Sequence, residues 1–161
     1  MKATNWFWWL ALSAVVVILD QMTKQWVTQS LGLREIIPVM PSFNLVLAHN
    51  TGAAFSFLAG AGGWQRGFFI GIAVVAAVVI VHLLRKHHGE KLFSLALALI
   101  LGGALGNLID RTRLGHVVDF LDFYVQNWHW PAFNVADMAI TAGAGLLIWD
   151  SLKKPARQET L

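Results

Sequence analysis

Three aspartates stand in an apolar stretch near the C-terminal end of the chain, GHVVDFLDFYVQNWHWPAFNVAD, positions 115 to 137. They are Asp119, Asp122 and Asp137, and the stretch contains no lysine or arginine. Two carboxyl groups within hydrogen-bonding distance do not readily both ionise, so they share a proton and divide two roles. The ionised member takes a proton from an attacking water, while the protonated member donates to a peptide carbonyl. Such a pair is typical of peptide-bond hydrolysis.

Asp119 and Asp137 are the candidates for this pair, because neither has a basic residue close to it in the sequence. Apolar neighbours such as Phe120 and Val135 favour keeping one carboxyl group neutral. Asp122 lies three residues from Asp119 and is expected to be solvated at a loop surface. The spacing of eighteen residues does not by itself show that Asp119 and Asp137 meet.

Other chemistries have weaker support. The chain has no cysteine, which excludes thiol catalysis and disulfides, and no serine stands in a G-x-S-x-G motif. His116 and His129 flank Asp119, but without an H-E-x-x-H motif a zinc site is disfavoured, and we expect the histidines to be interfacial side chains. We predict no metal and no cofactor. A net charge of +3 without a clustered basic surface also disfavours a nucleic-acid partner.

The chain is strongly apolar for its length. Of 161 residues, 57% are hydrophobic and 13% are charged, with a mean hydropathy of +0.58, which indicates a membrane protein. Residues 67–84 and 92–109 carry no charge, and at about 1.5 Å per residue each covers roughly 27 Å, close to the hydrocarbon thickness of a bilayer. Two further spans, each with acids, are predicted at residues 5–25 and 133–152. We expect a mainly α membrane protein with four transmembrane helices in a single domain, 1–161.

Basic residues gather on the side that would hold both termini and the loop between the second and third spans. Seven of the twelve lie there: Lys2, Arg85, Lys86, Lys91, Lys153, Lys154 and Arg157. The positive-inside rule predicts that this side is cytoplasmic. The outer segments, residues 26–66 and 110–132, are not helical in pattern. The first of them has two prolines, a β-prone run at 43–47 and a turn at 50–52, and it predicts a small β-containing extracytoplasmic cap.

Alternating helix direction brings polar residues from separate segments to the outer face. Gly103, Asn107 and Arg111 recur at intervals of four and share one helix stripe, while Gly102 and Gly106 form a G-x-x-x-G pair that is typical of close helix packing. The polar residues expected at this face are Asp20, Asn50, Asn107, Asp110, Arg111, Asp119, Asn134 and Asp137.

Carboxylates are costly within a membrane, by about 2.5–3.5 kcal/mol at the helix centre. Ion pairs could offset the cost for two of the acids. Asp20 could pair with Lys24 one turn on, and Asp110 with Arg111 or Arg113. For these two acids the sequence supports an ion pair and a functional role equally.

Two other classes of function stay open at this point. Membrane-embedded acids also serve ion transport and proton relays, although a conducting path needs polar groups through the whole membrane depth and the predicted mid-spans are apolar. The Gly-rich third span could instead dock a partner helix in a non-catalytic assembly subunit. Cleavage of the first span as a signal peptide is disfavoured, because the run lacks a small-residue cleavage pattern.

Five short blocks occur in order along the predicted spans. They are DQMTK (20–24), NTGAAF (50–55), GGALGNLIDR (102–111), GHVVDF (115–120) and FNVAD (133–137). Together they resemble the lipoprotein signal peptidase (signal peptidase II) family of bacteria, and no polar position of these blocks departs from the family pattern.

This resemblance implies an aspartyl endopeptidase of the bacterial inner membrane, inhibited by the cyclic peptide globomycin. We expect a monomer, because one chain supplies every group of the site. Its substrate would be a prolipoprotein cut before a diacylglyceryl-modified cysteine, beside membrane lipid and without metal or cofactor. Asp119 and Asp137 would be the catalytic dyad at the periplasmic face. The supporting residues implied are Asp20, Asn50, Gly52, Asn107, Arg111 and Asn134. We further expect the segment 25–66 to close over the bound peptide.

Overall fold

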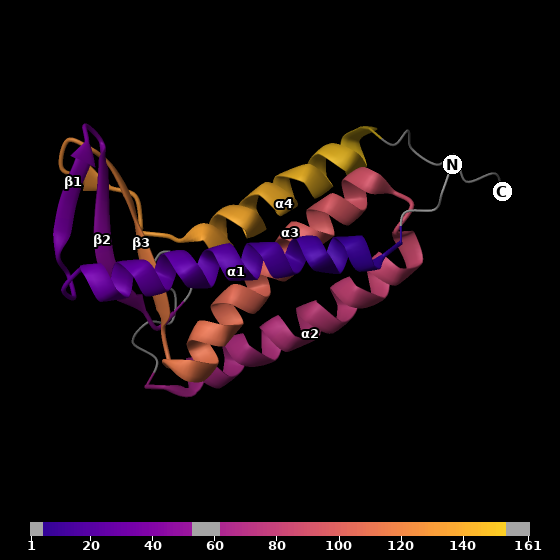
Figure 1. The fold of residues 1–161 in the computed structure, drawn as a ribbon, viewed down its shortest axis with the longest axis horizontal. Helices are drawn as coiled ribbons and strands as arrows, with labels where there is room; N and C mark the ends of the chain where they lie inside the picture. Colours follow the sequence, from indigo (N-terminus) through magenta and orange to yellow (C-terminus); the bar gives the residue numbers. More distant parts are fainter. Residues whose placement is uncertain (1–4, 53–61, 154–161) are drawn as a thin grey trace.

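Four long helices dominate the structure, a computed structural model that describes residues 5–52 and 62–153 (Figure 1). They are α1 (Phe7–Ser30), α2 (Trp64–His87), α3 (Lys91–Arg113) and α4 (Val135–Lys153). Each is long and apolar enough to cross a membrane. The expectation of a mainly α membrane protein with four spans is therefore confirmed.

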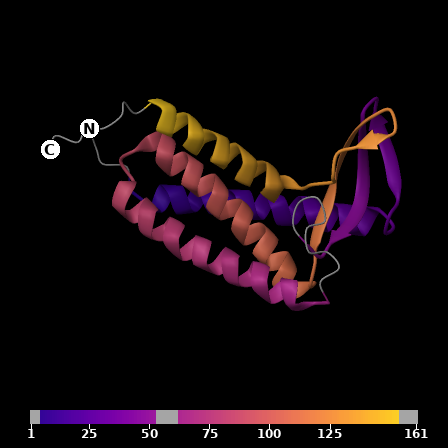
Figure 2. The same ribbon diagram turned by 180° about the vertical axis from the view of Figure 1, so that it is seen from behind.

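α3 is the central helix, since α1, α2 and α4 all pack against it (Figures 1 and 2). Glycine makes this close packing possible. A Cβ on Gly102 would lie 2.6 Å from Cβ of Val16 in α1, and one on Gly103 would collide with the backbone of Ala136 in α4. The two glycines therefore let α1 and α4 approach different faces of α3.

The ends of the helices differ from the predicted spans. α1 continues to Ser30 rather than residue 25, because Val27 and Leu31 pack in the apolar core of the cap and keep the last turns helical beyond the predicted span. α2 begins at Trp64 and α3 ends at Arg113, so the first and last parts of these helices also lie in segments predicted to be non-helical.

The cap is a four-stranded antiparallel sheet at one end of the bundle (Figure 1). Its strands, in the order β1-β2-β3-β4, are β1 (Ile36–Met40), β2 (Phe43–Asn50), β3 (Val117–Val125) and β4 (Trp128–His129). The predicted β-prone run 43–47 begins β2. The sheet is held to the bundle by Leu47, Val118 and Phe120, which pack on Val27 of α1 and on Leu31 directly after it.

The chain reverses after β3 and returns beside it. The Phe133 carbonyl accepts hydrogen bonds from the backbone amides of Phe120 and Leu121, at 3.0 and 2.9 Å, and the Phe133 amide donates to the Leu121 carbonyl at 3.1 Å. This return brings the start of α4 next to the middle of β3. Asp119 and Asp137, eighteen residues apart in the sequence, are brought close together in space in this way.

The opposite end of the bundle holds the start of α1, the α2–α3 connection and the end of α4 (Figure 1). Four of the predicted inner-side bases, Arg85, Lys86, Lys91 and Lys153, lie at these helix ends. The other three, Lys2, Lys154 and Arg157, fall outside the described residues. So does the stretch 53–61, which belongs to the segment 25–66 that we expected to act as a lid.

Candidate active site

Asp119 and Asp137 approach each other at the junction of sheet and bundle. Asp119 lies on β3 and its exposed fraction is 2%, while Asp137 lies in the first turn of α4. Asn134 contacts both, because its side-chain Nδ2 donates to Asp119 Oδ1 at 2.7 Å and its backbone amide donates to Asp137 Oδ2 at 3.3 Å. One residue thus links the two carboxylates.

A reciprocal cap at the start of α4 fixes Asp137. The Asn134 side-chain oxygen accepts from the Asp137 amide at 2.9 Å, and the Asp137 carboxylate accepts from the Asn134 amide. This is the capping-box arrangement, with asparagine and aspartate in place of the usual serine and glutamate. It satisfies two amides that the helix leaves unpaired, and it holds a carboxylate where the helix dipole favours negative charge.

Asn107 of α3 is the second amide that reaches Asp137. Its Oδ1 accepts from the Lys24 ammonium at 2.9 Å, and its Nδ2 donates to Asp137 Oδ1 at 2.8 Å. Since an ammonium group can only donate, the amide oxygen must face Lys24. The amide NH₂ is then directed to the carboxylate.

Asn50 follows the same logic from β2. The Gly52 amide donates to Asn50 Oδ1 at 3.0 Å, and Asn50 Nδ2 donates to Asp119 Oδ2 at 3.0 Å. Each of the three asparagines therefore has its oxygen held by an obligatory donor and its NH₂ aimed at a carboxylate of the pair. These hydrogen bonds fix the orientation of both carboxyl groups, and each of them favours the ionised form of the group it reaches, in opposition to burial.

Lys24 lies behind this site in a buried ion cluster. Its Nζ is 2.8 Å from Asp20 Oδ2 and 3.0 Å from Asp110 Oδ2, and the side chains of all three residues are almost fully buried. The predicted Asp20–Lys24 pair is confirmed. The predicted pairing of Asp110 with Arg111 or Arg113 is wrong, because Asp110 faces α1 and meets the lysine there.

The ion cluster also fixes the backbone around the site. The Ala136 amide at the start of α4 donates to Asp20 Oδ1 at 2.9 Å, and the Val118 amide in β3 donates to Asp110 Oδ2 at 3.1 Å. The two acids therefore position the elements that carry Asp137 and Asp119. Lys24 was assigned only a local pairing from the sequence. Its contacts with Asn107 and Asp110 join α1 to α3. Contacts between residues so far apart in the sequence cannot be predicted from the residues next to Lys24.

Arg111 borders the pair on the side of α2. Its Nη2 donates to the Gly52 carbonyl at 2.8 Å, and its guanidinium carbon lies 4.9 Å from the centroid of the Phe69 ring. Among the described residues its buried Nε has no hydrogen-bond partner. Asn50, Asn107 and Asn134 donate to the dyad directly, and Gly52 is joined to it through Asn50. Arg111 is joined through Gly52 and Asn50 in turn, and Asp20 through the Ala136 amide next to Asp137.

The environment of Asp119 changes its acidity. Burial, and next the nearby Asp137 carboxylate, raise the pKa of Asp119 to about 7, although the hydrogen bonds from Asn50 and Asn134 and the charge of Lys24 lower it. Near neutral pH this carboxyl group therefore passes between its acid and base forms. A group of this kind can serve as a proton donor.

Asp122 is not solvated, so that prediction is wrong. Its exposed fraction is 5%, its Oδ2 accepts from Asn44 Nδ2 at 2.8 Å, and His129 Nδ1 lies 2.9 Å from its Oδ1. Asn44 pairs with Asp122 across β2 and β3. Residues an odd number apart in a strand point to opposite faces, so Asp122 points away from Asp119. The cross-strand register buries it.

The two histidines near the site do not share one environment. His129 pairs with Asp122, as stated above. His116 stacks on His49 with the ring centroids 3.8 Å apart, and burial together with that neighbour lowers the pKa of His116. Within residues 5–52 and 62–153, no group of three or more potential ligands is arranged to hold a metal ion.

The Asp122→Asn variant is expected to keep cleavage activity and to lose stability in the cap. The substitution removes the negative charge that strengthens the hydrogen bonds with Asn44 and His129, and hydrogen bonds to charged groups contribute about 1.5–3 kcal/mol. Thermal unfolding and peptide cleavage by the same purified variant test this. A complete loss of cleavage without unfolding would place Asp122 in the reaction.

The sequence was compared with protein families and with known proteins. Residues 12–153 match the profile of a family described as signal peptidase (SPase) II. The chain is similar to a lipoprotein signal peptidase of Ralstonia nicotianae, with 59% identity covering 92% of this chain and 86% of the relative. It is also similar to a lipoprotein signal peptidase of Cupriavidus necator, with 58% identity covering 92% and 85%.

Solved structures share the fold. One, described as a bacterial membrane enzyme, superposes with a TM-score of 0.83 and 31% identity, covering 95% of this chain and 92% of that one. A second has a TM-score of 0.79 and 32% identity over 91% and 93%. The arrangement of helices and cap is therefore one that bacterial membrane enzymes adopt.

Proposed function

Since the chain belongs to the signal peptidase II family and removes signal peptides from prolipoproteins, we propose that Asp119 and Asp137 are its catalytic dyad. The observation that carries the proposal is the shared partner Asn134, which donates to both carboxylates. The two acids lie side by side with their orientation fixed, as an acid–base pair requires.

The two members divide the roles. Asp119, whose pKa is raised to about 7, holds the proton and donates it to the oxygen of the scissile carbonyl. Asp137, at the N-terminus of α4 and bonded by Asn107, carries the negative charge and accepts a proton from the attacking water. When the tetrahedral intermediate breaks down, Asp137 gives the proton it took from water to the leaving amine, and Asp119 takes back its proton from the hydroxyl as the carbonyl re-forms. The pair thus returns to its starting state, and the chemistry needs no other charged group.

Substrate backbone is held by the residues that border the pair. Arg111 fixes the Gly52 carbonyl, and Asn50 and Gly52 form a turn beside Asp119. Asp20 acts through Lys24 and the backbone of α4 and so is a positioning residue.

We assign the basic end of the bundle to the cytoplasm and the cap to the periplasmic face of the inner membrane, according to the positive-inside rule. A precursor anchored by its own helix then reaches the dyad laterally from the bilayer and is cut before its lipidated cysteine. One chain supplies every group named here, so a monomer is sufficient.

A transport or proton-relay function has less support. The buried polar side chains of the far half of the bundle are bonded to backbone carbonyls: Ser13 Oγ donates to Ala98 at 2.8 Å and Ser94 Oγ donates to His87 at 3.0 Å. They do not continue the ion cluster toward the basic end. The family also contains proteases rather than carriers.

The direct test uses the full chain in bilayers with a precursor that carries a diacylglyceryl cysteine. Cleavage before that cysteine is expected, and the same precursor without lipid is expected to react at least about tenfold more slowly, because remote binding energy contributes to catalysis. Mass spectrometry of the products locates the cut. Equal cleavage rates for the two precursors would show that the protein does not recognise the lipid on the cysteine.

The pH dependence of cleavage is expected to follow Asp119. The raised pKa means that the proton is present below pH 7 and is lost as pH rises through about 7. Since the acid form donates, kcat/KM should fall on the alkaline side with a midpoint near 7. Steady-state rates from pH 5 to about 9 measure it.

Two asparagine variants provide a matched test of this assignment. Asn50→Ala removes a hydrogen bond that lowers the pKa of Asp119, so the alkaline midpoint should move upward. Asn44→Ala removes the equivalent bond to Asp122 on the other face of the sheet and should leave the midpoint in place. Movement in the second variant alone would contradict the assignment.

A further inference from the structure

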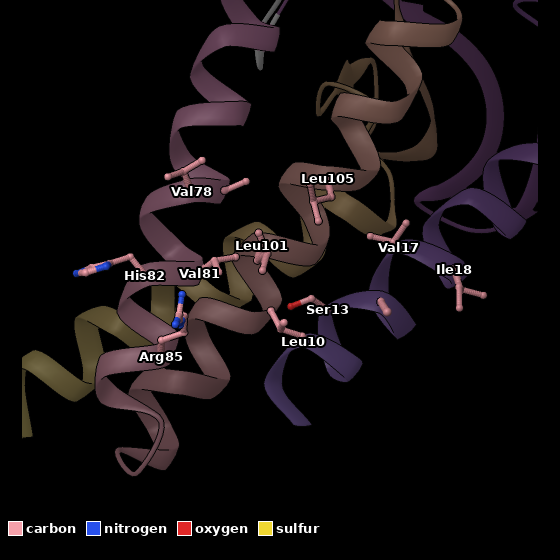
Figure 3. A pocket seen from close by; sticks show the side chains of 12 residues that line it. Leu10, Ser13, Val17, Ile18, Val78, Val81, His82, Arg85, Leu101 and Leu105 are labelled. Carbon is pink, nitrogen blue, oxygen red and sulfur yellow. The ribbon is translucent and has the colours of Figure 1, made fainter. Parts of the chain in front are cut away.

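An apolar groove runs between α1 and α2 in the half of the bundle farthest from the dyad (Figure 3). Its volume is about 820 Å³, within the range of pockets that hold small molecules. Leu10, Val17 and Ile18 of α1 form one wall, and Val78 and Val81 of α2 form the other. The groove is open to the bilayer, since Val78 and Ile18 are 66% and 55% exposed.

The floor of the groove is α3, on a face that does not reach the active site. Leu101 and Leu105 form this floor, and Asn107 lies two residues beyond Leu105. Two residues correspond to about 200° of helix rotation, so Asn107 and the dyad are on the other side of α3. The groove is therefore separate from the site proposed for cleavage. Ser13, a polar residue of the α1 wall, already uses its hydroxyl on the Ala98 carbonyl.

One end of the groove is basic. Arg85 lies there and extends along α2 toward the space between the helices, while His82 stands at the rim (Figure 3). The guanidinium carbon is 5.4 Å from the centroid of the Trp6 ring at the start of α1, which places a cation between the two walls. In the part of the chain that the structure describes, no carboxylate pairs with Arg85.

We propose that this groove binds one anionic phospholipid, with an acyl chain against the leucine and valine walls and the phosphate on Arg85. An apolar slot ending in a guanidinium that pairs with no carboxylate of residues 5–52 and 62–153 matches that chemistry, because guanidinium groups bind phosphate in a bidentate manner. The same charge disfavours the signal helix of a substrate, whose cytoplasmic end is itself basic. The lipid would fill the space between α1 and α2 and support the bundle on the side away from the dyad.

Native mass spectrometry of the full chain, titrated with phosphatidylglycerol or phosphatidylcholine of the same acyl chains, tests the proposal. The anionic lipid is expected to bind at least about fivefold more tightly, in line with one basic residue near a lipid headgroup. Arg85→Gln should remove most of that preference. Lys86→Gln, the neighbouring exposed cation outside the groove, should change it less than twofold.

A second variant tests the apolar part. Ala14 lines the groove, and Ala14→Phe should reduce binding of both lipids while cleavage of a prolipoprotein continues. Equal losses in Arg85→Gln and Lys86→Gln would show diffuse surface attraction and overturn the proposal. Equal binding of the two lipids, no effect of Ala14→Phe, or displacement of lipid by a signal peptide or a second copy of the chain would also overturn it.

Discussion

Replacing Asp119 or Asp137 by asparagine is expected to reduce prolipoprotein cleavage by about 10³-fold or more in each single variant. General acid–base catalysis contributes about 10²–10⁴-fold for each group, and the two carboxyl groups act as one unit, so the double variant should be little worse than either single one. Purified variants and a lipidated precursor give the rates. Full cleavage by one of the single variants would exclude the dyad.

The two substitutions should differ in stability, which gives the experiment its control. Both oxygens of Asp119 accept hydrogen bonds from side-chain NH₂ groups. In Asp119→Asn the new NH₂ group would face one of these donors, and the lost hydrogen bond should lower stability by about 1–3 kcal/mol. The bonds to Asp137 come from Asn107 and from a backbone amide at the longer distance of 3.3 Å, so Asp137→Asn should unfold closer to wild type. Inactive but folded Asp137→Asn protein then assigns the loss to chemistry.

The membrane spans could be predicted from the sequence because a bilayer requires long segments that are apolar and almost free of charge. Charge-free intervals such as 67–84 and 92–109 are sufficient to locate α2 and α3. The ends were less readable. α1 runs on to Ser30 because the cap covers its last turns, and this covering is a tertiary contact that local hydropathy does not contain.

Within the site, helix direction placed Asp20, Asn107 and Asn134 at one face without any knowledge of the cap. What the sequence could not supply was strand register. The β2–β3 pairing sets Asn44 opposite Asp122 and so buries an acid that its local neighbours suggested was solvated. The run VVDFLDFYV, residues 117–125, is rich in valine and aromatic residues, which was a signal for a strand, and residues three apart in a strand lie on opposite faces.

Lys24→Met is expected to destabilise the protein by about 3–5 kcal/mol, because it leaves two buried carboxylates without their shared cation. Asn107 also loses the donor that fixes its amide, so Asp137 loses a well-oriented NH₂ and cleavage should fall together with stability. In detergent the midpoint of thermal unfolding should drop by on the order of 10 °C.

A charge-matched control and a compensating variant show whether the cluster itself is responsible. Lys91→Met removes an exposed cation at the start of α3 and should change stability by less than about 0.5 kcal/mol. Adding Asp110→Asn to Lys24→Met removes one of the two buried carboxylates that have lost their cation. Part of the lost stability should therefore return, even though a second member of the cluster has been replaced. If the double variant were instead less stable than Lys24→Met by the full cost of Asp110→Asn alone, the two residues would be uncoupled. In that case the ion cluster would not be what positions β3 and α4 around the dyad.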